Sequence, residues 1–249
     1  MEQYIGWEQF EQAFPIQLNE QQKSAVQSID GPVLLLAVPG SGKTTVLVAR
    51  LGYMIYCRGI DPSQILTVTY TVAATKDMSR RFAGYFGEKL ADRLEFRTIN
   101  GLCAKIISYY GRMIGKTPFE LVQDEKMTAG MLSMIYQQSE HEYATESDLK
   151  TVRTLITYIK NMMLTEKEIL ELDEKAELKI SVIYKEYCRQ LRAKGLMDYD
   201  DQMVYAYTML RSVPELLKHF QELYPYICVD EAQDTSKIQH AIIALLASG

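Results

Sequence analysis

The stretch Val33–Thr45, VLLLAVPGSGKTT, decides the expected fold of this 249-residue chain. Its first six residues, Val33–Val38, are apolar and predict a buried strand, and a helical pattern, Thr44–Tyr56, follows the glycine-rich turn at once. Glycines allow such a turn to point backbone N–H groups inward, where a phosphate can accept hydrogen bonds at the helix N-terminus. The stretch therefore predicts a strand–loop–helix unit that binds a nucleoside triphosphate.

The predicted phosphate loop also contains the side chains that this chemistry needs. We expect Lys43 to reach the β- and γ-phosphates and the Thr44 hydroxyl to bind Mg²⁺. The full pattern G-x-x-x-x-G-K-[ST] is missed at its first position, where Ala37 stands. A glycine turn that precedes a lysine by chance is the alternative, and the strand and helix on either side disfavour it. The predicted nucleotide-binding residues of the loop are Pro39, Gly40, Ser41, Gly42, Lys43, Thr44 and Thr45.

The same alternation of strand and helix recurs along the chain. Short apolar segments predict three more strands, at Ile65–Tyr70, Leu94–Thr98 and Tyr226–Asp230, and helical patterns follow them at Ala73–Phe86, Gly101–Tyr110 and Ser236–Leu246. This order is typical of an α/β fold with a doubly wound parallel sheet.

Between Arg112 and Asp198 the strand signals disappear. Four helical patterns occupy this region, at Lys126–Gln138, Asp148–Met163, Thr165–Leu172 and Glu174–Lys194. We interpret it as an all-helical subdomain inserted into the α/β core. The expected organisation is residues 1–111 as the first part of the core, 112–198 as the insertion, and 199–249 as the second part of the core.

Composition narrows the class of protein. A net charge of −5 argues against a protein that coats nucleic acid by bulk electrostatics, although it leaves room for a local basic groove. The four cysteines are far apart and the chain has three histidines, which disfavours both a zinc site and a disulfide framework. We see no secretory signal and no apolar run long enough to cross a bilayer, so we expect a cytoplasmic protein without a membrane partner.

Carboxylates gather where the last predicted strand ends. Asp230 comes at the carboxyl end of the strand, the edge at which open α/β sheets bind ligands, and an Asp there can complete a Mg²⁺ site. Glu231 follows directly and can orient or deprotonate a water that attacks the γ-phosphate. The alternative is an acidic N-terminal cap for the next helix, for which Asp234 is well suited.

Six motifs in order along the chain resemble those of the UvrD/Rep/PcrA-like superfamily-one DNA helicases. They are LNEQQKSAV (18–26), AVPGSGKTT (37–45), ILTVTYTVAATKDMSRRF (65–82), FRTINGLCAKII (96–107), MDYDDQM (197–203) and VDEAQDTSKIQ (229–239). Ala37 is the usual residue in this family's phosphate loop, so the departure noted above disappears. The acidic MDYDDQM segment is weak by itself, because its aspartates can equally cap the following helix.

The resemblance implies a RecA-like P-loop core that uses ATP and Mg²⁺. Gln22 is implied to read the adenine edge with both functions of its amide, Asp230 to bind the metal, and Glu231 to act as catalytic base. Lys43 is the second implied catalytic residue. Gln233 and Gln239 are implied to couple nucleotide state to DNA. The implied contacts to single-stranded DNA are Tyr70, Thr71, Arg97, Thr98 and Asn100.

The chain departs from the family pattern mainly in its DNA motifs. Val72 and Ala73 stand where the family usually has Asn and Lys, and Ile99 and Asn100 replace an aromatic residue and His. Thr45 stands where Arg is frequent. These changes remove a basic contact, a stacking surface and a nucleotide contact, and they bear on DNA affinity more than on membership of the family.

The resemblance implies a DNA helicase or translocase, acting on single strands and duplex junctions in repair or replication. In this family a second α/β domain follows the DExQDT motif, so we expect an N-terminal fragment that lacks its C-terminal half and is inactive alone as a motor. The alternatives are a non-motor module that binds nucleotide or DNA without turnover, and a nucleotide kinase, which the Gln22 motif and DExQDT pattern disfavour. The oligomeric state is left open by these residues.

Overall fold

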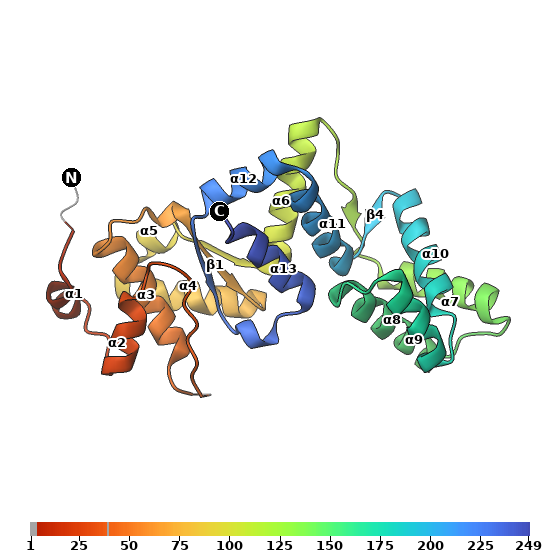
Figure 1. Cartoon of the computed structure of the whole chain (residues 1–249), viewed down its shortest axis with the longest axis horizontal. Helices are drawn as coiled ribbons and strands as arrows, with labels where there is room; N and C mark the ends of the chain where they lie inside the picture. Colours follow the sequence, from red (N-terminus) through yellow and green to blue (C-terminus); the bar gives the residue numbers. More distant parts are fainter. Residues whose placement is uncertain (1–3, 39) are drawn as a thin grey trace. The chain divides into compact units, whose positions relative to one another are not determined.

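The computed structural model describes residues 4–38 and 40–249, and these divide into two compact units (Figure 1). The first contains the residues up to Ile99, Lys218–Asp234 and Leu246–Gly249, and the second contains Asn100–Leu217 and Thr235–Leu245. The chain is mixed α/β with a parallel sheet and many helices. The predicted insertion, residues 112–198, lies within the second unit, which also contains all of α11 (Tyr199–Ser212) and all but the first residue of α6 (Ile99–Ile114).

A three-stranded parallel sheet organises the first unit. Its order is β2 (Glu95–Thr98), β1 (Ile65–Thr69), β5 (Tyr226–Val229), with Thr69 opposite Thr98 and Val68 opposite Val229. All five residues of β1 are buried, as expected for a strand that is paired on both edges and also contacted by α4. Three of the four predicted strands are thus confirmed, and their carboxyl ends meet at one edge of the sheet.

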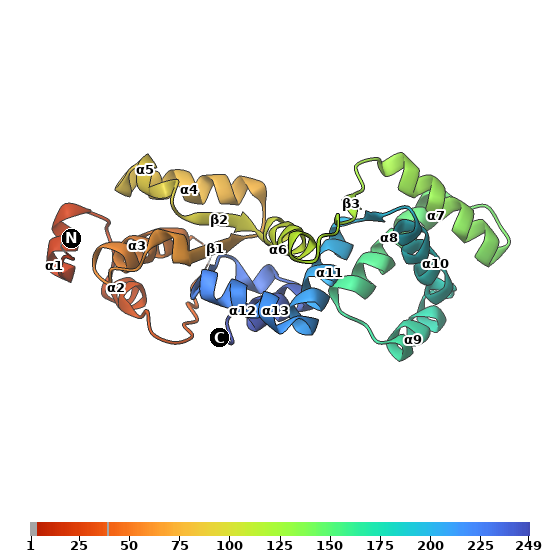
Figure 2. The same cartoon turned by 90° about the horizontal axis from the view of Figure 1, so that it is seen from above.

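Helices on the same unit cover the sheet and carry an aromatic cluster. Figure 2 shows α4 (Val72–Phe86) running alongside β1 and β2, while α3 (Lys43–Tyr56) contacts α4. From α1 (Trp7–Ala13), Phe10 stacks on Phe86 with ring centroids 6.0 Å apart. The remaining elements of this unit are α2 (Glu20–Gln27), η1 (Pro62–Gln64), α5 (Glu88–Ala91), η2 (Ala232–Asp234) and part of α12 (Pro214–Leu223).

The predicted strand Val33–Val38 is wrong for the described chain. No strand is assigned there, and the side chains are exposed, with Leu34 at 76% and Leu36 at 83% of their surface. The segment has the composition of a buried strand, but a strand also needs a partner backbone. Among the described residues, β1 is already flanked on both sides and no strand pairs the outer edge of β5.

The second unit is mostly helical. Helices α7 (Glu125–Glu140), α8 (Glu146–Asn161), α9 (Glu166–Ala176) and α10 (Ile180–Ala193) share one core that includes Leu132, Val152, Ile156, Ile180 and Ile183. The expectation of an all-helical insertion is wrong in one detail, because β3 (Glu120–Leu121) pairs in parallel with β4 (Leu196–Met197). Strands of two residues are too short to leave a periodic signal in the sequence. The unit also contains most of α13 (Lys237–Leu246).

Substitutions in the exposed apolar segment test this arrangement. Leu36→Ala is expected to change the free energy of unfolding of this chain by less than about 0.5 kcal/mol, because an exposed side chain loses no packing. The matched change in β1, Leu66→Ala, removes a fully buried side chain and should cost about 2–5 kcal/mol. Urea unfolding followed by circular dichroism measures both, and a large loss for Leu36→Ala would mean that Val33–Val38 is packed in solution.

Candidate active site

The phosphate loop forms the N-terminal entry to α3. Gly40 and Gly42 have φ of 78° and 82°, the left-handed region in which side chains are strained, so glycine is required at both positions. Gly42 is also the N-cap of α3 and makes no side-chain cap hydrogen bond, which leaves this helix end without a side-chain acceptor. Thr44 and Thr45 lie half-buried in the first turn, and the predicted loop residue Pro39 lies outside the described residues.

Ser41 is held in the loop by hydrogen bonds at both its N–H and its carbonyl group. Its N–H donates to the Val38 carbonyl over 3.2 Å, and its own carbonyl accepts from Gln22 Nε2 over 3.0 Å. Its hydroxyl is buried and has no hydrogen-bond partner among the described residues. A buried hydroxyl without a partner is costly, and a phosphate oxygen bound in this loop is a suitable acceptor for it.

Gln22 is placed by the start of α2. Its Oε1 accepts from the Asn19 N–H over 2.9 Å, while its own N–H donates to Asn19 Oδ1 over 2.9 Å, a capping box. With Nε2 bonded to Ser41, both functions of the amide are engaged by the protein. The resemblance implied that both functions read adenine, and in this structure both are already bound to backbone groups.

Lys43 and Glu231 come together although 188 positions separate them. Lys43 Nζ lies 3.8 Å from Glu231 Oε2, and the same oxygen accepts from Gln233 Nε2 over 2.5 Å. Glu231 adopts φ of 51°, which is uncommon for a residue with a side chain. The predicted base and the predicted phosphate-binding lysine therefore share one location, with Gln233 beside them.

Asp230 continues the sheet beyond β5. Its N–H donates to the Val68 carbonyl over 2.9 Å, and its Oδ1 accepts from the Glu231 N–H over 3.1 Å. Burial, and then the charge of Glu231, raise the pKa of the Asp230 carboxyl above its ordinary value. A cation bound at this carboxylate would reverse that effect, since it favours the ionised form.

The oxygen donors of Thr44 and Asp230 suit an ion such as Mg²⁺, which needs few protein ligands, better than an ion whose ligands all come from the protein. No group of three or more His, Cys, Asp or Glu side chains that could hold an ion is found among residues 4–38 and 40–249. Mg²⁺ is usually bound through one or two protein oxygens, with phosphates and waters completing its shell. The Thr44 hydroxyl and the Asp230 carboxylate are donors of that kind.

The residues predicted to contact DNA lie partly at the same sheet edge. Tyr70 follows β1 and exposes 55% of its surface, and Thr98 ends β2 opposite Thr69. Thr71 caps α4 by accepting from the Ala74 N–H over 3.1 Å. An exposed aromatic ring at a strand end can stack on a base.

Two of the predicted DNA residues are differently placed. Arg97 pairs with Glu95 two residues before it on β2, so its charge is already partnered. Asn100, in the first turn of α6, belongs to the second unit. Arg97 would have to leave Glu95 before it could contact a phosphate.

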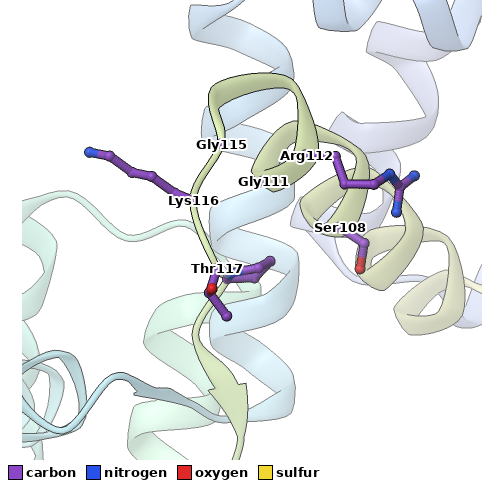
Figure 3. A pocket seen from close by; sticks show the side chains of 7 residues that line it. Ser108, Gly111, Arg112, Gly115, Lys116 and Thr117 are labelled. Carbon is purple, nitrogen blue, oxygen red and sulfur yellow. The ribbon is translucent and has the colours of Figure 1, made fainter.

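The second unit has a pocket of about 430 Å³ where α6 ends. It is lined by Ser108, Gly111, Arg112, Gly115, Lys116, Thr117 and Pro118. Figure 3 shows that the side chains of Arg112 and Lys116 point in different directions, so the two cations do not converge on one ligand. None of these residues was predicted to carry chemistry.

Comparison with known proteins decides the family. The UvrD/REP helicase N-terminal domain matches residues 18–249, nearly the whole chain. The chain belongs to the UvrD/REP helicase family. Within the part that the structure describes, no helix is long and apolar enough to cross a membrane.

Relatives of this UvrD/REP-family chain are themselves named helicases. The DNA helicase II homolog of Mycoplasma capricolum is 32% identical over 234 residues, which is 92% of this chain and 32% of that protein. The ATP-dependent DNA helicases PcrA of Staphylococcus epidermidis and Leuconostoc citreum are 30% and 28% identical, over 93% and 92% of this chain and 32% and 31% of their own lengths. The chain thus spans about a third of the length of the curated relatives it matches.

The acidic MDYDDQM segment of this UvrD/REP-family chain is a helix cap that also anchors α11. Asp198 and Asp201 form a capping box at its start, as expected from the alternative that these aspartates cap the following helix. The buried Lys160 of α8 lies 2.7 Å from Asp198 Oδ2 and 2.8 Å from Asp201 Oδ1. Burial alone would lower the Lys160 pKa, but the two carboxylates outweigh it and raise the pKa above its ordinary value.

Further contacts strengthen this anchor, and the sequence reasoning missed them. Asp200 accepts from Thr157 Oγ1 and from Asn161 Nδ2, each over 2.7 Å, and the Tyr187 hydroxyl lies 3.3 Å from Asp198 Oδ2. The sequence signal for a buried Lys160 was its position after Ile156 and Ile159 on an apolar helix face.

Gln239, implied to couple nucleotide state to DNA, is buried, and its amide donates to Met203 Sδ over 3.6 Å.

Removal of the buried cation tests this anchor. Lys160→Met should lower the free energy of unfolding by about 3–5 kcal/mol, because the largely buried charges of Asp198 and Asp201 are left without a cation. Lys167→Met is the matched control: Lys167 is exposed and pairs loosely with Glu171, so the change should stay within about 0.5 kcal/mol. Urea unfolding of both variants is the measurement, and equal losses would contradict the anchor.

Proposed function

We propose that this chain is the ATP-binding N-terminal part of an ATP-dependent DNA helicase or translocase. The observation that carries the proposal is the meeting of Lys43, at the start of α3, with Glu231, at the end of β5. Membership of the UvrD/REP family and the helicase names of its relatives support the same reaction class. The substrates proposed are ATP and single-stranded DNA, including junctions with duplex.

Within this proposal Glu231 is the catalytic base and Lys43 the phosphate ligand. When no nucleotide is bound, the two side chains partially neutralise one another at 3.8 Å. A bound triphosphate competes for the Lys43 ammonium, which leaves the Glu231 carboxylate available to hold and deprotonate the attacking water. Gln233, which donates to the same carboxylate, is placed to orient it.

The other residues of the proposed site bind the nucleotide and its metal. Mg²⁺, when bound through Thr44 and Asp230, offsets the charge that develops on the transferring phosphate. The loop residues Pro39, Gly40, Ser41, Gly42 and Thr45 surround the phosphates in this proposal, and Gln22 faces the base. Tyr70, Thr71, Thr98, Arg97 and Asn100 are the proposed DNA contacts.

Within the mixed α/β fold, we propose that residues 1–111 and 199–249 form a RecA-like core and that residues 112–198 form a subdomain inserted into it. Two observations support a core completed by further parts of a longer protein. The relatives are about three times the length of this chain, and among the described residues the apolar side chains of Val33–Val38 are exposed and the outer edge of β5 is unpaired.

Completion of the site matters for rate. Arginines supplied by another domain accelerate phosphoryl transfer by roughly 10³–10⁵-fold in enzymes of this class. We therefore propose that the chain alone binds ATP·Mg²⁺, hydrolyses it slowly and does not unwind DNA. DNA-stimulated ATP hydrolysis with strand displacement by this chain would contradict that part of the proposal.

A second candidate is a module that binds nucleotide or DNA without turnover. It is favoured by the altered DNA motifs, with Val72, Ala73, Ile99 and Asn100, and by the pairing of Arg97 with Glu95. The retained Lys43 and Glu231 favour a working ATPase. Single-turnover hydrolysis separates the two candidates.

The proposed base has a direct test in this chain. Glu231→Gln keeps the shape of the side chain but removes its basicity, so slow ATP hydrolysis should fall by at least about 100-fold while nucleotide affinity persists. Hydrolysis of radiolabelled ATP and titration with a fluorescent ATP analogue measure the two effects.

The control for this test is Glu222→Gln, an exposed glutamate that pairs with Lys218 and lies outside the proposed site. It should leave both hydrolysis and binding unchanged. If Glu231→Gln hydrolyses ATP as fast as the unaltered chain, Glu231 is not the base.

A further inference from the structure

Gln22 connects the start of α2 to the phosphate loop through its two amide functions. Its Oε1 accepts from the Asn19 N–H over 2.9 Å, and its Nε2 donates to the Ser41 carbonyl over 3.0 Å. The amide nitrogen also sits 3.5 Å from the position that a Cβ on Gly42 would take. The side chain is therefore in contact with the loop itself, between Ser41 and Gly42.

The support behind Gln22 is rigid. Val26 of α2 and Val46 and Ala49 of α3 form one buried cluster, which fixes the two helices to each other. Arg50 of α3 adds a hydrogen bond of 2.7 Å from Nη1 to the Ala25 carbonyl. Because α2 cannot shift easily, the capping box at its start holds the Gln22 amide at a fixed point beside the loop.

The bond to Ser41 sets the direction of one peptide group. In a trans peptide the C=O and the next N–H point in opposite directions. While the Ser41 carbonyl points at Gln22, the Gly42 N–H must point away from it. If this peptide turned over, a carbonyl oxygen would take the place of an N–H donor in the loop and repel a phosphate.

We propose that Gln22 is a positioning residue for phosphate binding, which acts by holding the Ser41–Gly42 peptide with its N–H directed away from α2. The inference rests on the proposed nucleotide site and deepens it, because this role needs no contact between Gln22 and the base. In this role Gln22 affects the binding of every ligand that carries a polyphosphate chain. Recognition of the base would affect the binding of ATP but not of tripolyphosphate.

The inference has a test in which the base is removed from the ligand. Gln22→Met keeps the length of the side chain but cannot donate to Ser41. The affinity for inorganic tripolyphosphate and for ATP, each with Mg²⁺, should fall by the same factor, roughly 3- to 10-fold, the worth of one net hydrogen bond. Isothermal titration calorimetry of this chain measures both ligands.

Two variants serve as matched controls. Gln9 Oε1 accepts from the Gly6 N–H over 3.0 Å at the start of α1, as Gln22 Oε1 does from Asn19 on α2, so Gln9→Met repeats the loss of this bond without affecting the loop. Asn19→Ala removes the other half of the α2 box but leaves both side-chain bonds of Gln22 possible. Neither control should change the affinity for tripolyphosphate by more than twofold.

Each remaining outcome is informative. A loss of ATP affinity with unchanged tripolyphosphate affinity would overturn the inference, because Gln22 would then act on the base alone. Unchanged affinity for both ligands would overturn it too. If the unaltered chain binds neither ligand, the proposed function fails, and this is distinguishable from failure of the inference. A shift of the Gly42 amide resonance in ligand-free Gln22→Met, but not in Gln9→Met, supports the inference even if the variant is less stable.

Discussion

The constraint on which the first unit depends is the burial of β1 between two parallel neighbours. Its register places Thr69 opposite Thr98 on one side and Val68 opposite Val229 on the other. Parallel pairing brings residues separated by more than a hundred positions to one edge, which is why Tyr70 and Asp230 both emerge there. The charge chemistry of the site, including the meeting of Lys43 with Glu231, follows from this shared edge together with the start of α3.

The second unit is fixed by a different kind of contact. One buried lysine, Lys160, satisfies two carboxylates at the start of α11, and neutral donors from Thr157 and Asn161 satisfy Asp200. A buried ion pair adds little stability by itself, but a shift of α8 against α11 that separated its partners would leave a buried charge unpaired. Geometry, more than free energy, is what these contacts contribute.

Much of this arrangement could be predicted from local patterns, and the failures have physical causes. The glycines of the phosphate loop, three strands and the helices of the second unit leave strong short-range signals, and the carboxylates at Asp230 and Glu231 follow from strand polarity. The segment Val33–Val38 was misassigned because composition reports a preference for burial and says nothing about an available strand edge. Lys160 and the bond from Gln22 to Ser41 were missed because both link residues that are distant in the sequence, and a single Lys or Gln carries no periodic signal.

The left-handed backbone of Glu231 has a consequence for how this protein tolerates change. A residue with a side chain in that conformation costs on the order of 1 kcal/mol or more, and glycine adopts it freely. Replacement by glycine would therefore relax the main chain at the end of β5 while it deletes the proposed base, so fold stability and catalysis select opposite residues at this position. A search for more stable variants of this domain would therefore favour glycine here, the residue that removes the proposed base.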